Sequence, residues 1–378
     1  MPVAHLPHHL CQSTQQPTPF LVLLISSRLI SIYIHHLMSR FIPSSKVLAT
    51  KAFLNPVSFP CYFPRLPAKA THPSIQRRSC VRSMASSTGI GQPPQSQSTQ
   101  PGKQHLMDPI PKSISDDYKP SDKLLGKIAV VTGGDSGIGR AVSHLFALEG
   151  ATIAFTYVKG QEDKDAEDTL NILKEAKHPH AKDPIAIPTD LGYDENCKKV
   201  VEEIVDKFGH IDILVNNASE QHKANSVEDI DEERIIRVFR TDIFSYFFMT
   251  RHSLKHMKKG SAIINTLSLT AYIGTPKLLD YTAAKGATIA FTRGLAMQLM
   301  DKGIRVNGVS PGPTWTPVNA ASLSEEENAE LGKSEVPMKR AAQPYELAPS
   351  YLFLAANVYS SYISGQVIHP NGGTIVNS

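Results

Sequence analysis

Seven short apolar runs recur between residues 127 and 370, and longer amphipathic segments separate them. Each run is apolar through most of its length and rich in β-branched residues, which is typical of strands buried on both faces. The pattern therefore predicts a mostly parallel, seven-stranded sheet covered by helices. The runs are 127–132, 151–157, 184–189, 211–216, 261–266, 305–310 and 365–370.

The segments between the runs carry apolar side chains at helical spacing. In 196–208, for example, Val200, Val201 and Ile204 fall on one face, and 138–148 and 281–300 show helical patterns as well. Strand-like and helix-like segments alternate six times along the chain. We therefore expect one doubly wound α/β domain over 124–378.

The residues before this domain have a different composition. The first 107 residues contain ten Lys and Arg and no acid, so the net charge of +4 becomes −6 for the rest of the chain. A Ser- and Arg-rich, acid-free stretch is typical of a transit peptide, and we predict a disordered leader over 1–83 that directs the chain to the plastid stroma. A mitochondrial address, or a cytosolic form starting at Met84, is the alternative.

Residues 84–123 are rich in Gln, Ser, Pro and Gly and lack apolar periodicity. They predict a flexible linker or a loosely draped arm.

The apolar stretch at 20–34 is too short to span a membrane and contains Arg28, so no membrane anchor is expected. The acidic body disfavours nucleic-acid binding.

The domain also offers little for metal or thiol chemistry. It has no His/Cys pair at ligand spacing, so no metal site is expected. Cys197 is the only cysteine of the body, and a single thiol cannot form an internal disulfide. We expect Cys197, which falls in a helical segment, to be inert rather than nucleophilic.

A glycine-rich turn follows the first apolar run and precedes a helical segment. Glycine lets bare backbone approach a pyrophosphate, and a helix N-terminus offers N–H groups to that anion. Such a turn alone often only reverses the chain, but the order strand, glycines, helix predicts the phosphate cradle of a Rossmann-type dinucleotide domain. The candidate residues are Gly133, Asp135, Ser136, Gly137, Ile138 and Gly139.

The second apolar run ends at Tyr157 and is followed by Val158 and Lys159. In dinucleotide domains an acid here holds the adenosine ribose, whereas a base accepts a 2′-phosphate. Lys159 would favour the phosphate and Asp135 would repel it. The cofactor is therefore NAD or NADP, with a slight preference for NADP.

Tyr281 and Lys285 are four residues apart in a helical segment, so both side chains share one face. A free tyrosine has a pKa of about 10, and a nearby ammonium would stabilise its phenolate and make it a usable base. Ser268, thirteen residues earlier and just beyond a strand, could bind a substrate oxygen. Each feature is weak alone, and together they predict an oxidoreductase site.

These motifs resemble the short-chain dehydrogenase/reductase family in order and spacing, over the whole of 124–378, and the resemblance extends into the QPGKQHLMDPIP segment of the arm. The glycine turn, Asn216-Asn217-Ala218, Ser268, Tyr281/Lys285 and Pro311-Gly312 carry the resemblance. Within the family, TGGDSGIGRA, VFRTDIFSYFF, SPGPTWTP, VPMKRA and SGQVIHPNGG resemble plant chloroplastic glucose and ribitol dehydrogenase homologs.

The resemblance implies an enzyme that moves a hydride between a nicotinamide and a small polar alcohol, sugar, polyol, aldehyde or ketone. Tyr281 would be the general acid/base, Lys285 would lower its pKa and hold the nicotinamide ribose, and Ser268 would orient the substrate oxygen. A homotetramer is also implied. The remaining cofactor-binding residues would be Asp190, Leu191, Asn217, Ala218, Pro311, Gly312, Thr314 and Thr316.

Two positions depart from the family pattern. Ser219 stands where the family usually has glycine, and Asp242 stands where it has a fourth catalytic residue, asparagine. A carboxylate at 242 would raise the pKa of Lys285 and partly cancel its effect on Tyr281, so we expect reduced activity. The alternative function is a dinucleotide-binding stress or scaffold protein with little turnover.

The substrate pocket should lie between the loop after Pro311 and the segment that starts at Ser219. We expect the charged run 324–333 to be a solvated helical face of a lid. Candidates for the pocket wall are Trp315, Gln221, His222 and Met338.

Overall fold

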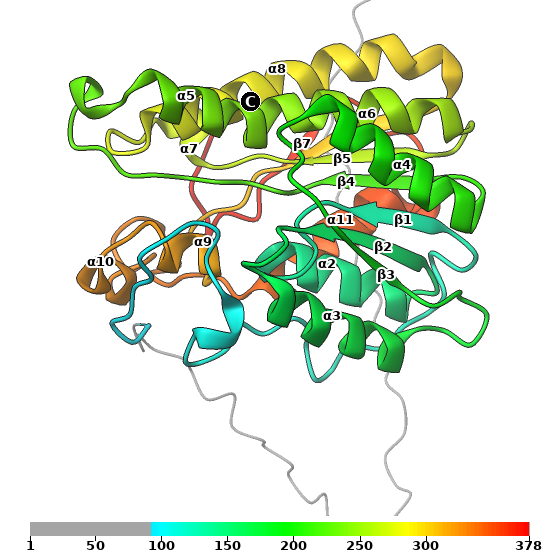
Figure 1. Ribbon diagram of the computed structural model, residues 1–378, viewed down its shortest axis with the longest axis horizontal. Coiled ribbons are helices and arrows are strands. Elements are labelled where there is room, and N and C mark those ends of the chain that lie inside the picture. The colour runs from blue at the N-terminus through cyan, green and yellow to red at the C-terminus, as the bar shows by residue number, and fades with distance from the viewer. Residues whose placement is uncertain (1–91, 378) are drawn as a thin grey trace, which may run out of the picture. The chain divides into compact units, whose positions relative to one another are not determined.

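A computed structural model describes residues 92–377, and the leader predicted over 1–83 lies outside these residues. Seven strands form one sheet in the order β3-β2-β1-β4-β5-β6-β7, and all neighbouring strands are parallel (Figure 1). The doubly wound fold is confirmed, and the sheet is wholly parallel. The strands are β1 Ile128–Val131, β2 Thr152–Tyr157, β3 Ile185–Pro188, β4 Ile213–Asn216, β5 Ala262–Thr266, β6 Arg305–Val309 and β7 Val367–Ile368.

Successive residues of the central strands point to opposite faces of the sheet, as strand geometry requires. Val131 and Val215 belong to one buried cluster, whereas Val130 and Leu214 belong to another. Both faces are therefore apolar, which explains why the strands are apolar along their whole length.

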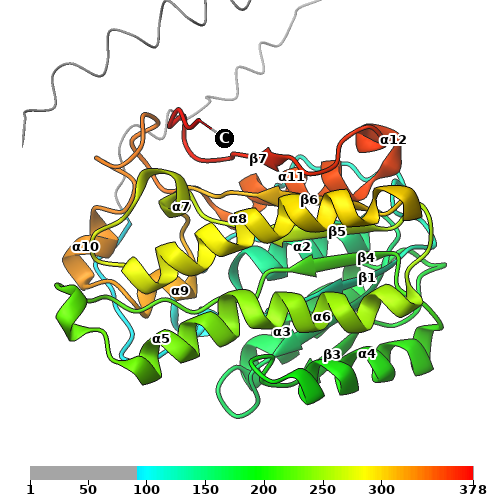
Figure 2. The ribbon, with the colours of Figure 1, turned by 90° about the horizontal axis from the view of Figure 1, so that it is seen from above.

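Helices cover both faces of the sheet. α2, α3 and α11 lie on one side, and α4, α6 and α8 lie on the other (Figures 1 and 2). No helix of the described part is long and apolar enough to span a membrane. The α-helices are α2 Gly137–Leu148, α3 Asp163–Ala176, α4 Asp194–Phe208, α5 Glu232–Phe239, α6 Ser245–Ser253, α7 Thr270–Ile273, α8 Leu279–Leu299, α9 Pro317–Ala320, α10 Glu325–Ala329, α11 Pro344–Ala355 and α12 Asn357–Ser360.

Short turns of other helix types connect these elements. η3 is a π-helical turn that joins α5 to α6 without a break and contains Asp242. A π-turn inserts a residue into the helical ladder and is frequent at functional sites. The short turns are η1 Gln104–Leu106, η2 Val227–Asp229, η3 Arg240–Phe244, η4 Leu254–His256 and η5 Met300–Lys302.

The arm that precedes β1 is packed in its described part, 92–123, instead of lying loosely over the domain. Gln104 and Met107 are buried, and the backbone N–H groups of Gln104 and His105 donate to the Asp165 carboxylate at 2.7 and 2.9 Å. Sequence composition missed this because the arm is held by a few isolated contacts without periodicity: Met107 packs in a cluster with Trp315, and Asp165 accepts the two backbone N–H groups.

The wholly parallel sheet decides where a site can form. The order of strands reverses between β1 and β4, and the carboxyl ends of parallel strands meet at one edge. In doubly wound sheets ligands bind in the crevice at such a switch point. The predicted motifs follow the strands β1 to β6, so the fold gathers them at this edge.

Candidate functional site

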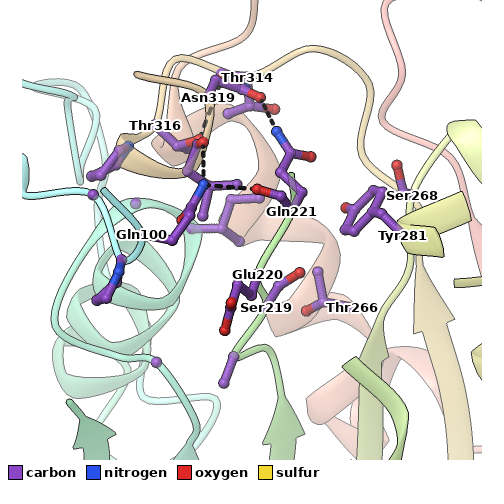
Figure 3. Close-up of a pocket in the computed structure, with 18 of the residues that line it drawn as sticks. Gln100, Ser219, Glu220, Gln221, Thr266, Ser268, Tyr281, Thr314, Thr316 and Asn319 are labelled. Carbon is purple, nitrogen blue, oxygen red and sulfur yellow. Dashed lines mark hydrogen bonds between the residues drawn. The ribbon is translucent and has the colours of Figure 1, made fainter. Parts of the chain in front are cut away.

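A pocket of about 610 Å³ lies at this edge of the sheet, a size suited to a small-molecule ligand. Figure 3 shows Thr314, Thr316 and Asn319 at one side of the pocket and Ser268 and Tyr281 at another. Nearly all residues predicted from the sequence line this pocket or support its lining.

The glycine turn after β1 has the close backbone approach that the sequence predicted. Gly133 has a φ of +61°, which favours glycine. A Cβ on Gly139 would lie 1.9 Å from the carbonyl oxygen of Gly133. Asp135, Ser136, Gly137 and Ile138 line the pocket beside the start of α2. The turn is therefore shaped so that bare backbone faces the pocket.

Asn217 and Ala218 brace this turn from the end of β4. The backbone N–H groups of both donate to the Thr132 hydroxyl at 2.7 and 3.0 Å, and the Asn217 amide donates to the carbonyls of Thr132 and Gly133. These contacts fix the loops after two neighbouring strands relative to each other.

The pocket continues past the end of β2 and β3. Tyr157, Asp190 and Leu191 line it as predicted, but Lys159 is exposed and does not. The chain turns away after Val158, whose N–H donates to the Glu162 carboxylate at 2.7 Å. The expected basic residue at this end of the pocket is therefore not supplied by Lys159.

Asp135 brings a carboxyl group to this end of the pocket. It is buried, and burial raises its pKa to about 7. Glu162 lies beside it, and burial together with the charge of Asp135 raises the pKa of Glu162 to about 9. Both groups are therefore easier to protonate than ordinary carboxyls.

The catalytic candidates come together on the other side of the pocket. Tyr281 and Lys285 share one face of α8, and the Lys285 Nζ atom lies 5.6 Å from the centre of the Tyr281 ring. The Ser268 side chain follows β5 and is nearly buried. Its hydroxyl accepts a hydrogen bond from the Thr270 hydroxyl at 3.0 Å, and Ser268 lowers the pKa of the Tyr281 phenol against the larger upward influence of burial.

Lys285 is fully buried, and its ammonium has three acceptors. They are the Asp242 carboxylate at 3.0 Å, the carbonyl of Thr266 at 3.1 Å and the Tyr246 hydroxyl at 3.2 Å. An ammonium has three N–H donors. The expected contact between Asp242 and Lys285 is therefore present. Each of the three N–H donors of the ammonium has an acceptor within the protein.

The pKa of Tyr281 is set by opposing influences. Burial raises it above the ordinary value, Lys285 lowers it, and Asp242 raises it again. For Lys285 itself, burial acts downward, but the phenol of Tyr246 and the carboxylate of Asp242 outweigh burial and raise the pKa. Lys285 is charged, and Tyr281 keeps its proton beyond the usual range.

The loop after β6 closes the pocket. Pro311, Gly312, Thr314 and Thr316 all line it. A Cβ on Gly312 would lie 2.8 Å from the backbone of Asn371, so this loop packs closely on the C-terminal segment. Sequence reasoning assigned the loop correctly to the pocket.

Only one of the four residues predicted to form the pocket wall lies in the pocket. Gln221 lines the pocket, whereas His222, Trp315 and Met338 do not. Trp315 is fully buried beside the arm, and its Nε1–H donates to the carbonyl of Pro109 at 2.8 Å. Met338 is exposed on the surface. The predicted helical run contains α10, whose Glu327 also reaches the pocket.

Sequence reasoning did not assign several residues of the site. Gln100, Pro101 and Gly102 of the arm line the pocket, and the Gln100 amide donates to the carbonyls of Gln221 and Val318, both at 3.1 Å. Their only signal was the similarity of the arm to the same plant proteins.

Arg237 of α5 was also missed. It lines the pocket, and it contacts Asp190 at 2.7 Å and Glu220 at 2.8 Å. No motif marks it. Cys197 is buried, and burial raises the pKa of its thiol to about 12. Residues 92–377 contain no group of His, Cys, Asp or Glu suited to a metal ion.

Comparison with known proteins supports this arrangement. A family model described as "Enoyl-(Acyl carrier protein) reductase" matches residues 133–374. A glucose and ribitol dehydrogenase from Daucus carota is 67% identical over 285 residues, which cover 75% of this chain and 97% of that protein. The NADPH-dependent aldehyde reductase 1, chloroplastic, of Arabidopsis thaliana is 66% identical over 284 residues, which cover 75% and 98%.

A solved structure is similar over the same part of the chain. It is a short-chain dehydrogenase from Burkholderia cenocepacia J2315 in complex with NADP, 28% identical, with a TM-score of 0.60. The match covers 66% of this chain and 98% of that one.

Proposed function

The chain belongs to the short-chain dehydrogenase/reductase family, and on this premise we propose that it is an NAD(P)-dependent oxidoreductase of small polar carbonyl compounds and alcohols, sugars or polyols. The observation that carries the proposal is the convergence of Tyr281, Lys285 and Ser268 on a pocket that also holds the glycine turn. A nicotinamide bound there would donate or accept the hydride.

The residues of the chain supply position and a proton. Ser268 would hold the substrate oxygen beside Tyr281, whose hydroxyl gives a proton to a carbonyl oxygen or takes one from an alcohol. Lys285 would stabilise the phenolate form. Holding these groups in fixed positions lowers the barrier because little reorganisation remains for the reaction itself.

The dinucleotide would extend from Tyr281 past the glycine turn to Asp190 and Leu191. Gly133 and Gly137 line the pocket beside the start of α2, where a pyrophosphate would meet bare backbone, and this supports the placement. The relative named as NADPH-dependent favours NADP, whereas Asp135 and the outward position of Lys159 favour NAD. We therefore keep both nucleotides.

The proposal is tested with the mature protein in two assays. Fluorescence titration with NADH and NADPH should give saturable binding to at least one of them. A panel of aldehydes, ketones, sugars and polyols should then show turnover that Tyr281→Phe abolishes while nucleotide binding persists. Full turnover by Tyr281→Phe would overturn the proposal.

A second candidate function is supported by the contact between Asp242 and Lys285. It is a dinucleotide-binding stress or scaffold protein with little turnover. Nucleotide binding without turnover of any carbonyl or polyol would favour this candidate over the first.

We also propose that the chain acts in the chloroplast stroma. The acid-free composition of 1–83 and the chloroplastic relative support this address. The predicted domain boundaries, with the leader over 1–83, the arm over 84–123 and the catalytic domain over 124–378, belong to this proposal.

A homotetramer is the proposed assembly. α6 and α8 expose apolar side chains, with Phe247 50% and Met297 73% exposed, and Met300 of η5, directly after α8, is 50% exposed. Apolar surface of this kind often marks an interface between proteins. Two such faces on neighbouring helices support contact between copies of the chain.

A further inference from the structure

Two residues that depart from the family pattern contact each other. The Ser219 hydroxyl donates a hydrogen bond to Oδ1 of Asp242, and the same oxygen lies 3.0 Å from the Lys285 ammonium. In the sequence they are 23 residues apart, in the loop after β4 and in η3. In the structure they form one unit behind Tyr281.

We infer that Ser219 and Asp242 form an anionic clamp on Lys285 that keeps the Tyr281 phenol protonated and adapts the site to carbonyl reduction rather than alcohol oxidation. The inference rests on the proposed function, because it concerns the direction in which Tyr281 moves a proton. Asp242 and Ser219 are positioning residues that act through Lys285.

Asp242 is fixed by contacts through its carboxylate and through its backbone. The side chains of Asp242 and Lys285 are both inaccessible to solvent. Oδ2 of Asp242 accepts a hydrogen bond from the backbone N–H of Glu220 at 3.1 Å. The backbone carbonyl of Asp242 accepts one from the Thr288 hydroxyl at 3.2 Å. The π-turn of η3 thus places a carboxylate beside the ammonium, with its oxygens engaged.

The electrostatic consequence follows from distance and burial. A lone ammonium would favour the phenolate of Tyr281, because opposite charges attract strongly where solvent is excluded. A carboxylate in contact with the same ammonium gives a pair with no net charge, so the pair stabilises the phenolate of Tyr281 less than a lone ammonium would. Burial is the largest influence on the Tyr281 pKa and raises it, Lys285 lowers it, and Asp242 raises it against Lys285. The Ser219 hydroxyl itself lowers the pKa slightly, so its part in the clamp is to hold the Asp242 carboxylate.

The other groups around the pair do not replace this charge. Tyr246 of α6 contacts Lys285 through a neutral hydroxyl, and burial raises its pKa to about 12. The Glu220 carboxylate is directed to Arg237 and His222. Tyr351 of α11 is bound to the Thr266 hydroxyl at 2.9 Å. Among the described residues, Asp242 is the anion in contact with Lys285.

The two directions of the reaction need opposite forms of Tyr281. In reduction, the carbonyl carbon receives a hydride from reduced nicotinamide and the carbonyl oxygen receives the proton of the Tyr281 O–H bond, whose electron pair stays on the phenolate. In oxidation, the phenolate takes the proton from the alcohol as the hydride leaves for oxidised nicotinamide. A protonated Tyr281 is ready for the first direction only.

Initial rates of both directions are measured from pH 6 to pH 10 with the full-length mature protein. In Asp242→Asn, the rise of the oxidation rate with pH should move to lower pH by about one unit, so that oxidation at pH 7 increases about tenfold. The reduction rate at pH 7 should change much less. Asp242→Ala also removes the carboxylate and should move the profile in the same direction.

Ser219→Ala tests the pairing. It should displace the oxidation profile when Asp242 is present and displace it much less in the Asp242→Asn background. Asp301→Asn, the same change at an exposed position of η5, is the matched control and should leave the profile in place.

An oxidation profile that stays in place in both Asp242 variants would overturn the inference, provided that Tyr281→Phe has lost turnover. If Tyr281→Phe keeps turnover, the proposed function itself fails. Equal displacement by Ser219→Ala in both backgrounds would remove Ser219 from the clamp.

Discussion

The side-chain oxygen of Gln104 accepts a hydrogen bond from the backbone N–H of Gly137 at 2.7 Å. Gln104 belongs to the arm, and Gly137 is the first residue of α2 and lines the pocket. A buried side chain from outside the sheet therefore satisfies a donor in the turn proposed to hold the dinucleotide.

Gln104→Ala should weaken both the fold and nucleotide binding. The Gly137 N–H would lose its buried acceptor, which costs about 1–3 kcal/mol. We expect a lower Tm and a several-fold higher Kd for the preferred nucleotide, measured by thermal unfolding and fluorescence titration. Gln366→Ala, at an exposed position, is the control. Unchanged nucleotide affinity in Gln104→Ala would separate the arm from the cofactor site.

Glu162→Gln should stabilise the protein at alkaline pH in the absence of nucleotide. Burial and the charge of Asp135 raise the pKa of Glu162 to about 9 in the folded state, while the unfolded chain ionises near pH 4.5. Between these two pH values the Glu162 carboxyl is protonated in the folded state and ionised in the unfolded chain. The free energy of unfolding therefore falls as pH rises. The Tm difference from wild type should be near zero at pH 4.5 and several degrees positive at pH 8.

The matched control for this prediction is Glu167→Gln, an exposed position of the same helix. Its Tm should follow wild type at both pH values. A Glu162→Gln effect of equal size at pH 4.5 and pH 8 would contradict a role for the ionisation of Glu162.

Arg305→Lys should destabilise the domain. The buried guanidinium donates to the carbonyls of Leu354 and Ala355, at the end of α11, and to Asn357 and Ser360. An ammonium cannot match this planar set of donors, so acceptors near the helix end lose their partners. We expect a loss of about 1–3 kcal/mol in urea unfolding. Arg293→Lys, exposed on α8, should unfold like wild type.

Phe247→Asp should break the proposed assembly. Phe247 is half exposed on α6, and its ring centre lies 4.2 Å from that of Phe291 on α8. A charge buried in an apolar interface is costly. Light scattering after size exclusion should show a smaller particle, whereas Tyr362→Asp, at a fully exposed tyrosine, should not change the mass. An unchanged mass for Phe247→Asp would exclude this face as the interface.

Local patterns were sufficient to predict the framework of the domain. Each strand lies within one of the seven apolar runs, because a strand covered on both faces needs apolar residues throughout. The helix that carries Tyr281 begins at Leu279, two residues before the predicted start. The glycine turn was recognisable because close backbone approach restricts which residues can occupy it.

The parts that could not be predicted depend on contacts between distant segments. The Gln104 contact spans 33 positions and the Ser219–Asp242 contact spans 23. Periodicity carries no information about such pairs. The outward position of Lys159 has a local cause instead, because the chain turns after β2, where the Val158 N–H donates to the Glu162 carboxylate four residues on.

Because the arm lines the pocket, activity should depend on the residue at which the polypeptide starts. A chain beginning at Met84 retains both Gln100 and Gln104, whereas one beginning at Met107 has neither. A cut within 95–104 would remove arm residues that line one wall of the pocket. Trimming at this end would then inactivate the enzyme without touching Tyr281.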